Sequence, residues 1–455
     1  MKLYPDSKVY ISCPGNLKTG GPESLYQLAS TLLSLGVPTY MIYGASIMAQ
    51  FNPQDPVHDA YKKYHVPYVT SVENNPKNIV IITEAIIVQD ENKLRRVIWW
   101  MSVNNYIKKI WMEFFPLLEN PLAVPLSKIF NAFEVYHEDK NVEHWFKSEY
   151  ARQFLELNGV PADKLRYVEA YANRLFLSRA AQIDLSAKKN IVAFNPRKDF
   201  EIIQELIKLA LDIDWRPIEK MTTEQVQELL VSAKIYLDLG EHPGKDRLPR
   251  EAILSGCMVI TGRRGAAGND VDYNLPAEFK FDERENTPRD ILEKIRAVFE
   301  NFEQAHAAQK SFRERELNAQ KDFIAQVIDA FEIKNFPPPT VAFTQGFGEK
   351  SFLLAQKFSG RKDFVPRFIV DDEAASEKFY DELVWRDCNR NFLLGEEPLL
   401  EIITRDDAKF LYQEGRIKKF ALLEPTADEL DALKNFYGAD DSELLLFDEK
   451  NEPVL

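Results

Sequence analysis

The chain has 455 residues, enough for two or three domains, and its 45% hydrophobic and 28% charged residues are typical of a water-soluble globular protein. It contains no apolar run of about 18 residues, which excludes a membrane-spanning helix, and its start lacks the apolar core of a secretory signal peptide. The formal net charge of −14 is concentrated in residues 338–455, where 15 Lys and Arg face 25 Asp and Glu, and this excess of acid argues against a nucleic-acid surface there.

The cysteines give a further indication of the compartment. Cys13, Cys257 and Cys388 are odd in number and far apart in the sequence. Such thiols fit a reducing cytosol better than a disulfide framework, and no pair has the spacing of a zinc site. We therefore expect a cytoplasmic protein that does not bind nucleic acid.

Residues 1–180 alternate between strand-like and helix-like patterns, which predicts a Rossmann-like domain with a parallel sheet. The expected elements, in chain order, are a strand at Lys8–Ser12, a helix at Glu23–Leu35, strands at Thr39–Tyr43, Ile79–Thr83 and Arg96–Met101, and an amphipathic helix at Glu143–Asn158. Gly36 and Gly159 are expected to end the two helices.

The loop Gly15–Pro22 follows the first expected strand and contains Gly20 and Gly21. Glycine tolerates backbone angles that other residues resist, so this loop can approach a ligand closely. A plain tight turn is the alternative interpretation of the two glycines.

Residues 185–335 repeat the alternation and predict a second Rossmann-like domain. The expected strands are at residues 190–194, Trp215–Ile218, Ile235–Leu239, Met258–Thr261 and, at one edge, Glu278–Phe281; the expected helices are at Met221–Ser232, at Pro249–Ser255 and, long and charged with a break near His306, at Pro288–Phe331.

Residues 340–455 follow an extended proline-rich spacer, Phe336–Thr340, and predict a small acidic α/β or α+β domain. The expected strands are at Thr340–Phe343, Phe368–Val370, Leu399–Thr404, Phe420–Leu423 and Leu444–Phe447, and the expected helices at Ala374–Leu383 and Thr426–Phe436. Its role, as an interaction module or an accessory domain, is left open by the sequence.

The segment Tyr236–Cys257 is the most informative of the chain, because a buried strand passes through a polar loop into a helix there. Ligands of open α/β sheets bind at such a position, and a helix N-terminus suits a phosphate. Glu251, expected in the first turn of the helix, is placed to accept hydrogen bonds from a ribose diol. The candidate ligand-binding residues of the loop are Gly240, Glu241, His242, Gly244, Lys245, Asp246 and Arg247.

Two further cations, Arg197 and Lys198, lie in the loop after the first strand of the second domain. Cations and helix N-termini at the same sheet edge would stabilise a diphosphate that gains charge as it leaves. A solvated turn is the alternative for Arg197 and Lys198, and an acid that only satisfies the helix dipole is the alternative for Glu251.

The run EHPGKDRLPREAILSG resembles the E-x7-E motif of GT-B glycosyltransferases, in the retaining group that uses nucleotide sugars. Glu241 matches the first acid, Gly244 the loop glycine and Glu251 the second acid. The spacing departs from the motif, because two extra residues near Lys245–Asp246 separate the glutamates. The resemblance covers roughly residues 8–335.

The resemblance implies two Rossmann-like domains that face a cleft, with the donor in the second domain and the acceptor in the first. It implies that Glu251 binds the ribose, that Glu241 contacts the donor sugar, and that Arg197 and Lys198 neutralise the diphosphate as catalytic residues. The other implied donor-binding residues are Gly20, Gly21, His242, Gly244, Lys245, Arg247 and, near the base, Ile218.

The implied reaction is transfer of a sugar from a nucleotide-diphosphate donor, such as a UDP- or GDP-sugar, to an acceptor hydroxyl, with retention and without a metal or other cofactor. The acceptor would be a glycan, a lipid-linked or a protein hydroxyl, in bacterial surface-polysaccharide or lipopolysaccharide assembly. Two alternatives are a non-catalytic GT-B-like partner subunit, motivated by the expanded motif, and a sugar-nucleotide epimerase.

Other polar patterns carry less weight. The Asp-x-Asp pairs Asp212–Asp214 and Asp270–Asp272 do not end an early strand, as a metal-binding pair of a GT-A enzyme would. The stretch Arg95–Phe115 mixes aromatic and basic residues. A core strand with an amphipathic helix explains this mixture better than a contact with an acceptor or with a membrane surface. A peripheral contact with the inner membrane face and an oligomer contact both stay open. An inverting mechanism would need a base in the first domain, for which His137, Glu138 and Asp139 are candidates only by position.

Overall fold

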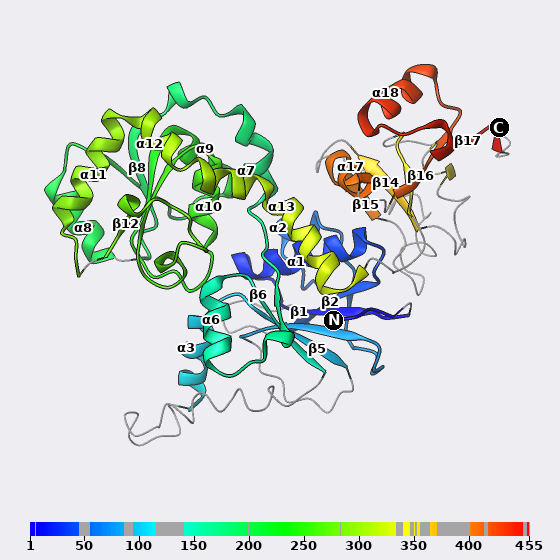
Figure 1. The fold of residues 1–455 in the computed structure, drawn as a ribbon, viewed down its shortest axis with the longest axis horizontal. Helices are drawn as coiled ribbons and strands as arrows, with labels where there is room; N and C mark the ends of the chain where they lie inside the picture. Colours follow the sequence, from blue (N-terminus) through cyan, green and yellow to red (C-terminus); the bar gives the residue numbers. More distant parts are fainter. Residues whose placement is uncertain are drawn as a thin grey trace. The chain divides into compact units, whose positions relative to one another are not determined.

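The computed structural model describes residues 1–4, 6–44, 55–85, 94–114, 141–198, 200–282, 284–333, 340–345, 350, 353–354, 365–370, 401–413, 417–448 and 453–454. Three sheets, one in each predicted domain, organise these residues (Figure 1). The chain divides into two compact units, residues 1–81, 91–95 and 327–455 in the first and residues 82–90 and 96–326 in the second.

The first sheet has the strand order β3-β2-β1-β4-β5-β6-β7, and every strand pair with a recorded register is parallel. Its strands are β1 (Val9–Pro14), β2 (Thr39–Gly44), β3 (Tyr68–Val69), β4 (Ile79–Thr83), β5 (Arg95–Trp100), β6 (Val142–Phe146) and β7 (Leu165–Tyr167). Its main helices are α1 (Gly20–Ser34), α3 (Val103–Phe114) and α6 (Glu149–Leu157). The parallel arrangement confirms the predicted fold class of this part.

The second sheet is parallel throughout, with the order β12-β11-β10-β8-β9. Its strands are β8 (Lys189–Phe194), β9 (Asp214–Pro217), β10 (Ala233–Asp238), β11 (Met258–Gly262) and β12 (Lys280–Phe281). Its helices are α7 (Arg174–Arg179), α8 (Phe200–Leu209), α9 (Thr223–Ser232), α10 (Arg247–Leu254), α11 (Pro288–Glu300) and α12 (Phe302–Ala308), followed by α13 (Lys310–Ala330).

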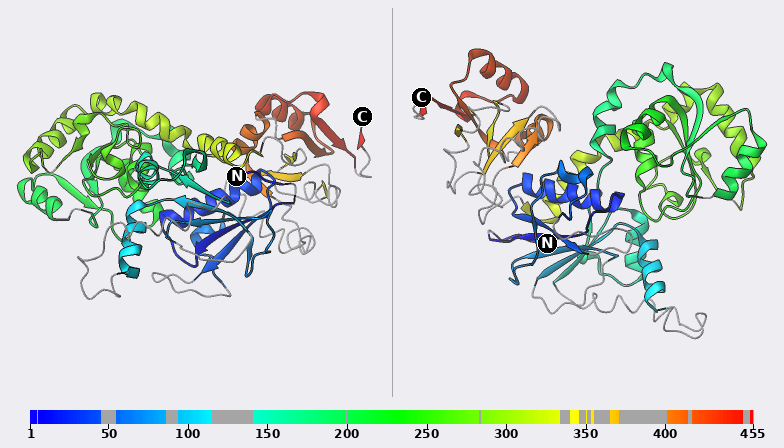
Figure 2. Two further views of the ribbon diagram at one scale, coloured as in Figure 1. Left: turned by 60° about the horizontal axis from the view of Figure 1, so that its bottom comes forward. Right: turned by 180° about the vertical axis from the view of Figure 1, so that it is seen from behind.

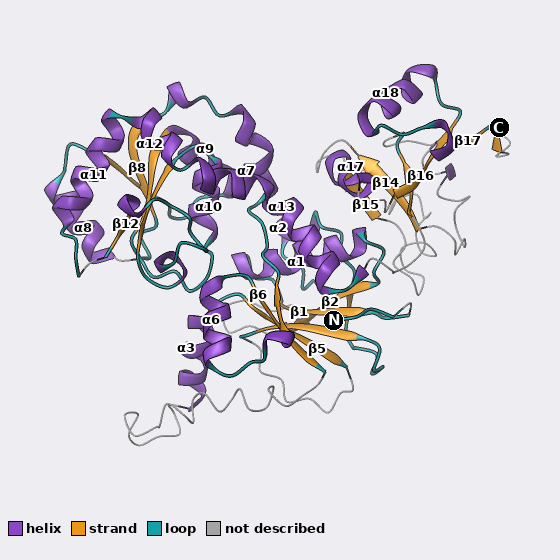
Figure 3. Cartoon of the chain, in the orientation of Figure 1, coloured by secondary structure: helices purple, strands orange, loops and turns teal. Residues whose placement is uncertain are grey.

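Helices cover both faces of the second sheet (Figure 3), and Figure 2 shows the same layers from two further directions. Alternate residues of β10 point to opposite faces. Ile235 and Leu237 pack in a buried cluster with residues of α8 and α11, whereas Tyr236 packs in a second cluster with residues of α9 and α10. This burial on both faces is typical of a doubly wound parallel sheet.

The third sheet has the order β15-β14-β13-β16-β17-β18, with only the pair β17–β18 antiparallel. Its strands are β13 (Thr340–Phe343), β14 (Val365–Val370), β15 (Glu401–Thr404), β16 (Ile417–Leu423), β17 (Leu444–Phe447) and β18 (Pro453–Val454), and its described helices are α17 (Arg405–Gln413) and α18 (Ala427–Tyr437). Thr426 and Glu429 form the predicted capping box of α18. The helix predicted at Ala374–Leu383 and most of the spacer lie outside the described residues.

Several predicted boundaries are wrong. The N-terminal part of the helix predicted at Glu143–Asn158 is instead β6, because Trp145 is buried in a strand paired with both β5 and β7. The long helix predicted at Pro288–Phe331, with a break near His306, is three helices with breaks at Asn301 and Gln309. The buried amide of Gln309 forms hydrogen bonds with both backbone groups of Val259, at 2.9 and 2.7 Å.

No helix in the described part of the chain combines the length and the hydropathy that crossing a membrane would require.

The core of the second sheet gives a test of stability. Leu206 in α8 is fully buried, whereas Leu211, just beyond the helix, is 81% exposed. Leu206→Ala should lower the free energy of unfolding by about 2–5 kcal/mol, because it leaves a cavity, and Leu211→Ala should change it by less than about 0.5 kcal/mol. Urea denaturation followed by circular dichroism measures both, and equal effects would contradict the packing described.

Candidate functional site

Three loops leave the second sheet at the same edge. Strands β8, β10 and β11 are adjacent and parallel, so the loops that follow them start at their common carboxyl edge. These loops are residues 195–198, the β10–α10 loop (residues 239–246) and the β11 loop (residues 263–270). Such an edge is where ligands of α/β sheets bind.

The three loops pack closely because glycines stand at their contacts. A Cβ on Gly240 would lie 2.6 Å from the Cβ of Lys198, so the first two loops touch at this point. A Cβ on Gly265 would overlap the carbonyl oxygen of His242, and Gly265 has a φ of +60°, a region that favours glycine. Ala266 donates its backbone N–H to that same oxygen at 2.8 Å, which joins the β10–α10 loop to the β11 loop.

A buried charged cluster lies at the end of β10. The ammonium of Lys198 pairs with the carboxylates of Asp238, at 3.3 Å, and Asp246. His242, fully buried, has Nε2 at 3.5 Å from Asp238 and Nδ1 at 3.2 Å from Asp246. Burial lowers the pKa of Lys198, but the two carboxylates raise it further, so its net shift is upward. Lys198 thus ties the loop after β8 to the start of α10.

Three residues of this cluster carry groups that can ligate a metal ion. Asp238, His242 and Asp246 each offer a ligand atom, and these atoms lie within 4.8 Å of one another. However, the two carboxylates approach different ring nitrogens of His242, and a metal takes only one of them. An ion held by both carboxylates would also have to displace Lys198. The cluster therefore fits a network of ion pairs better than a metal cage.

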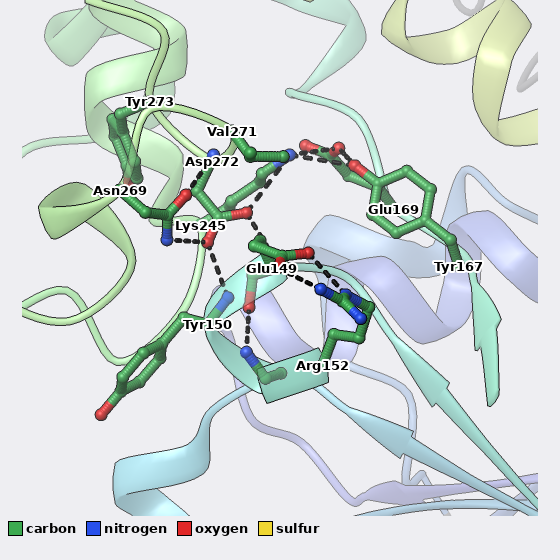
Figure 4. A network of polar contacts seen from close by, with 12 residues as sticks. Glu149, Tyr150, Arg152, Tyr167, Glu169, Lys245, Asn269, Val271, Asp272 and Tyr273 are labelled. Atoms are coloured by element: carbon green, nitrogen blue, oxygen red, sulfur yellow. Dashed lines mark hydrogen bonds and ion pairs between the residues drawn. The ribbon is translucent and has the colours of Figure 1, made fainter. Parts of the chain in front are cut away.

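Lys245 belongs to a second network (Figure 4). It is buried, and its ammonium lies 2.6 Å from Glu169 and 3.9 Å from Asp272. Asp272 in turn accepts hydrogen bonds from the backbone N–H groups of Glu149, at 2.7 Å, and Tyr150, at 2.9 Å, at the N-terminus of α6. Burial lowers the pKa of Lys245, against the effect of Glu169. The charge contacts of Lys245 therefore join the β10–α10 loop to Glu169 and Asp272.

Helix α10 begins at Arg247, two residues earlier than predicted, so Glu251 lies in its second turn and not in its first. Pro249 is tolerated because the N–H groups of a first helical turn have no intrahelical partner. Glu251 is 8% exposed, and its carboxylate lies 3.8 Å from Arg247. Arg250 on the same helix is buried and pairs with Glu316 at 2.5 Å. Glu251 thus lies beside Arg247, and its predicted place on the helix was wrong.

The remaining predicted residues are spread around this edge or away from it. Arg197 and Glu241 are exposed, and the charge of Glu241 adds to burial in raising the pKa of the Tyr150 phenol. Ile218 follows β9, and its N–H donates to the carbonyl of Phe194 at 2.8 Å. Gly20 and Gly21 lie in the other compact unit, where they are the first residues of α1 and have no positive φ. The loop predicted up to Pro22 therefore ends at Thr19.

Within each Asp-x-Asp pair, the two carboxylates contact different cations. Asp212 pairs with Arg296 at 2.7 Å and Asp214 with Arg216 at 2.6 Å. Asp270 pairs with Lys280 at 2.7 Å, whereas Asp272 lies 3.9 Å from Lys245. The candidate bases His137, Glu138 and Asp139 lie outside the described residues.

Sequence reasoning missed Lys147 and Glu84, which follow β6 and β4 of the first sheet. Gly244 approaches the first sheet here: an added Cβ would overlap the carbonyl oxygen of Met101 and lie 3.6 Å from the Cε of Lys147. Pro243 accepts a hydrogen bond from the N–H of Val103 at 3.2 Å. No motif indicates either residue, and only their position at a strand end could have drawn attention to them.

A cavity of about 480 Å³ adjoins the network of Lys245. Its polar lining is mostly acidic, with Glu149, Glu169, Asp272 and Asp322 against Arg315. Tyr167 and Phe146 add aromatic surface, and their ring centroids lie 5.5 Å apart. The volume is within the range of small-molecule sites, about 300–1,000 Å³.

No protein-family model matches the sequence, and no curated protein matches it. Among solved structures, it is similar to sucrose-phosphate synthase from Thermosynechococcus elongatus, with 12% identity over 71% of this chain and 97% of that chain and a TM-score of 0.47. Anabaena HepE in complex with UDP matches with 11% identity over 73% of this chain and 100% of that chain, at a TM-score of 0.45. The catalytic domain of starch synthase IV from Arabidopsis thaliana, bound to ADP and acarbose, matches with 10% identity over 71% and 100%, at 0.40. Likenesses this low do not by themselves assign an activity.

The ion pairs of Glu169 predict a pH dependence of stability. Burial alone would raise the pKa of Glu169, but Lys245, Arg250 and Arg315 lower it to about 2. Since the folded-state pKa is below the ordinary value of about 4.3, the carboxylate stabilises the fold above that pH, and this contribution disappears as the pH falls toward 2. Glu169→Gln should therefore cost about 3–5 kcal/mol at pH 7 and much less near pH 3.

Urea denaturation at both pH values measures this difference. Glu285→Gln, at an exposed position, is the matched control and should show no such dependence. A deficit of Glu169→Gln that stays constant from pH 7 to pH 3 would contradict the assignment.

Proposed function

We propose that the chain is a glycosyltransferase that moves a sugar from a nucleoside-diphosphate donor to an acceptor hydroxyl. The donor would bind at the carboxyl edge of the second sheet. One observation carries this proposal: Lys198 and the N-terminus of α10, two features expected to meet a diphosphate, are joined through Asp246 at that edge. The two features come from different loops, so the fold assembles them.

The physical basis is the charge of the leaving group. A nucleoside diphosphate gains negative charge as the glycosidic bond breaks. Groups that are held in place before the reaction stabilise that charge without reorganisation, which lowers the barrier. The N-terminus of α10, which the Lys198–Asp246 ion pair and the packed glycine contacts of the three loops hold in place, satisfies this condition.

Finer assignments follow from the resemblance to the E-x7-E motif. Glu251 would bind the ribose hydroxyls, Glu241 the donor sugar and the backbone near Ile218 the base. The reaction would proceed with retention and without a metal. The acceptor would be a glycan, a lipid-linked or a protein hydroxyl in bacterial surface-polysaccharide or lipopolysaccharide assembly. Arg197, exposed beside Lys198, would contact the diphosphate in this proposal.

Turnover of a nucleotide sugar tests the reaction itself. The purified chain should release nucleoside diphosphate from at least one donor among UDP-, GDP- and ADP-sugars, and chelation with EDTA should change the rate by less than about twofold. A thermal-shift screen selects the donor, since a ligand of the native state raises its melting temperature. Release that needs a divalent metal would overturn metal independence, and conversion of the sugar without transfer would indicate an epimerase.

The role of Glu251 gives a separate prediction. Glu251→Ala should weaken binding of the selected nucleoside diphosphate by about 1.5–3 kcal/mol, because hydrogen bonds between a carboxylate and the ribose are lost. Isothermal titration calorimetry measures the change. Glu293→Ala, at an exposed position of α11, serves as the control. Equal affinities for the Glu251 variant and the parent would remove Glu251 from the site.

A further inference from the structure

Most cations near the β10–α10 loop already have an anionic partner. Lys198 pairs with Asp238 and Asp246, Lys245 with Glu169, Arg250 with Glu316, and Arg247 approaches Glu251 at 3.8 Å. The positive charge of each is therefore largely balanced inside the protein. These cations shape the loop, but a diphosphate would have to compete with their carboxylates.

Lys147 differs from these cations. It makes no hydrogen bond and no ion pair within 4 Å with any residue that the structure describes. It follows β6 at the carboxyl edge of the first sheet, just before Ser148, which caps α6. Its Cε lies 3.6 Å from the place where a Cβ of Gly244 would be. Its side chain therefore reaches the loop that contains the candidate donor site.

Burial, more than any single neighbouring charge, disfavours the charged form of Lys147. It lowers the pKa of Lys147 to about 8, with contributions from Arg250 and Arg247 and against the effect of Asp246 and Glu84. Glu84 balances the ammonium only in part, because burial raises the pKa of its carboxyl to about 7, against the hydrogen bond that it accepts from the N–H of Met101 at 2.9 Å. A cation that is disfavoured by burial and by neighbouring cations gains most from an anion brought by a ligand.

We propose that Lys147 and the β10–α10 loop at Gly244 form an anion subsite that binds a phosphate group of the donor's diphosphate. This inference rests on the proposed function and names a residue of the first sheet that the E-x7-E motif does not contain. Gly244 is part of the subsite because a side chain there would overlap Met101 and crowd Lys147. The bound phosphate supplies the counter-charge that Lys147 lacks.

The subsite also makes phosphate binding sensitive to pH. The charged and titratable groups that act on Lys147 are Arg250, Asp246, Glu84 and Arg247. Lys147 must be protonated to attract a phosphate, so affinity is full below its pKa of about 8 and falls as the pH rises above it. An arginine at this position stays charged throughout that range and removes the decline.

Lys147→Met and Lys147→Arg in the full chain test the proposal by calorimetry. The probes are inorganic pyrophosphate and the pairs UDP with uridine and ADP with adenosine. Lys147→Met should weaken binding of pyrophosphate and of the preferred diphosphate by about tenfold or more, the usual size of a lost charged contact. Affinity for the nucleoside alone should stay within about twofold. Lys189→Met, exposed at the opposite end of β8, is the control for loss of one positive charge.

The pH series gives the second readout. Between pH 7 and pH 9.5 the parent should lose diphosphate affinity about tenfold, whereas Lys147→Arg should lose less than about threefold. Unchanged diphosphate affinity of Lys147→Met, or an equal loss for nucleoside and diphosphate, would overturn the subsite while leaving the proposed function intact. Pyrophosphate binding that depends on Lys147, without turnover of any nucleotide sugar, would support the subsite and overturn the function. A parent chain that binds none of the probes would overturn both.

Discussion

The contact of Lys198 with Asp238 and Asp246 is the interaction on which the candidate site depends. Asp238 ends a central strand, Asp246 stands at the start of α10, and Lys198 comes from the loop after the neighbouring strand. Two carboxylates without this ammonium would repel each other in a largely buried place, since charge is expensive to bury unless it is paired. The pairing therefore fixes the loop and the helix N-terminus relative to the sheet.

This arrangement changes the role of the basic residues. A sequence rich in lysine and arginine near a strand end suggests unpaired cations that are available to bind a phosphate. In the folded chain, Lys198 and Lys245 balance carboxylates and hold the loop in place. In the subsite that we propose, Lys147, which follows a strand of the first sheet, adds a charge that has no such carboxylate partner. The proposal thus gives the shaping of the loop and the binding of the phosphate partly to different cations.

The C-terminal part of the chain has the strand order of a Rossmann-like sheet, with one antiparallel strand at its edge. The side-chain amide of Gln345 bonds both backbone groups of Leu423, at 2.9 and 2.7 Å, at the ends of the two central strands β13 and β16. This amide joins the residues that follow β13 to the end of β16.

The sequence by itself determined most of the strands, their parallel arrangement and the sheet edge that carries the candidate site, because these depend on local patterns of apolar residues and on the order of strand and helix. It misplaced the starts of α1 and α10 and missed the short strands β3, β7 and β18. It also missed β6, since a strand and a helix compete for the same apolar spacing until neighbours are known. Only the tertiary structure decided which charges pair and that Lys147 reaches Gly244. Those contacts join residues that are distant in the chain, and burial, which sets their charge, exists only after folding.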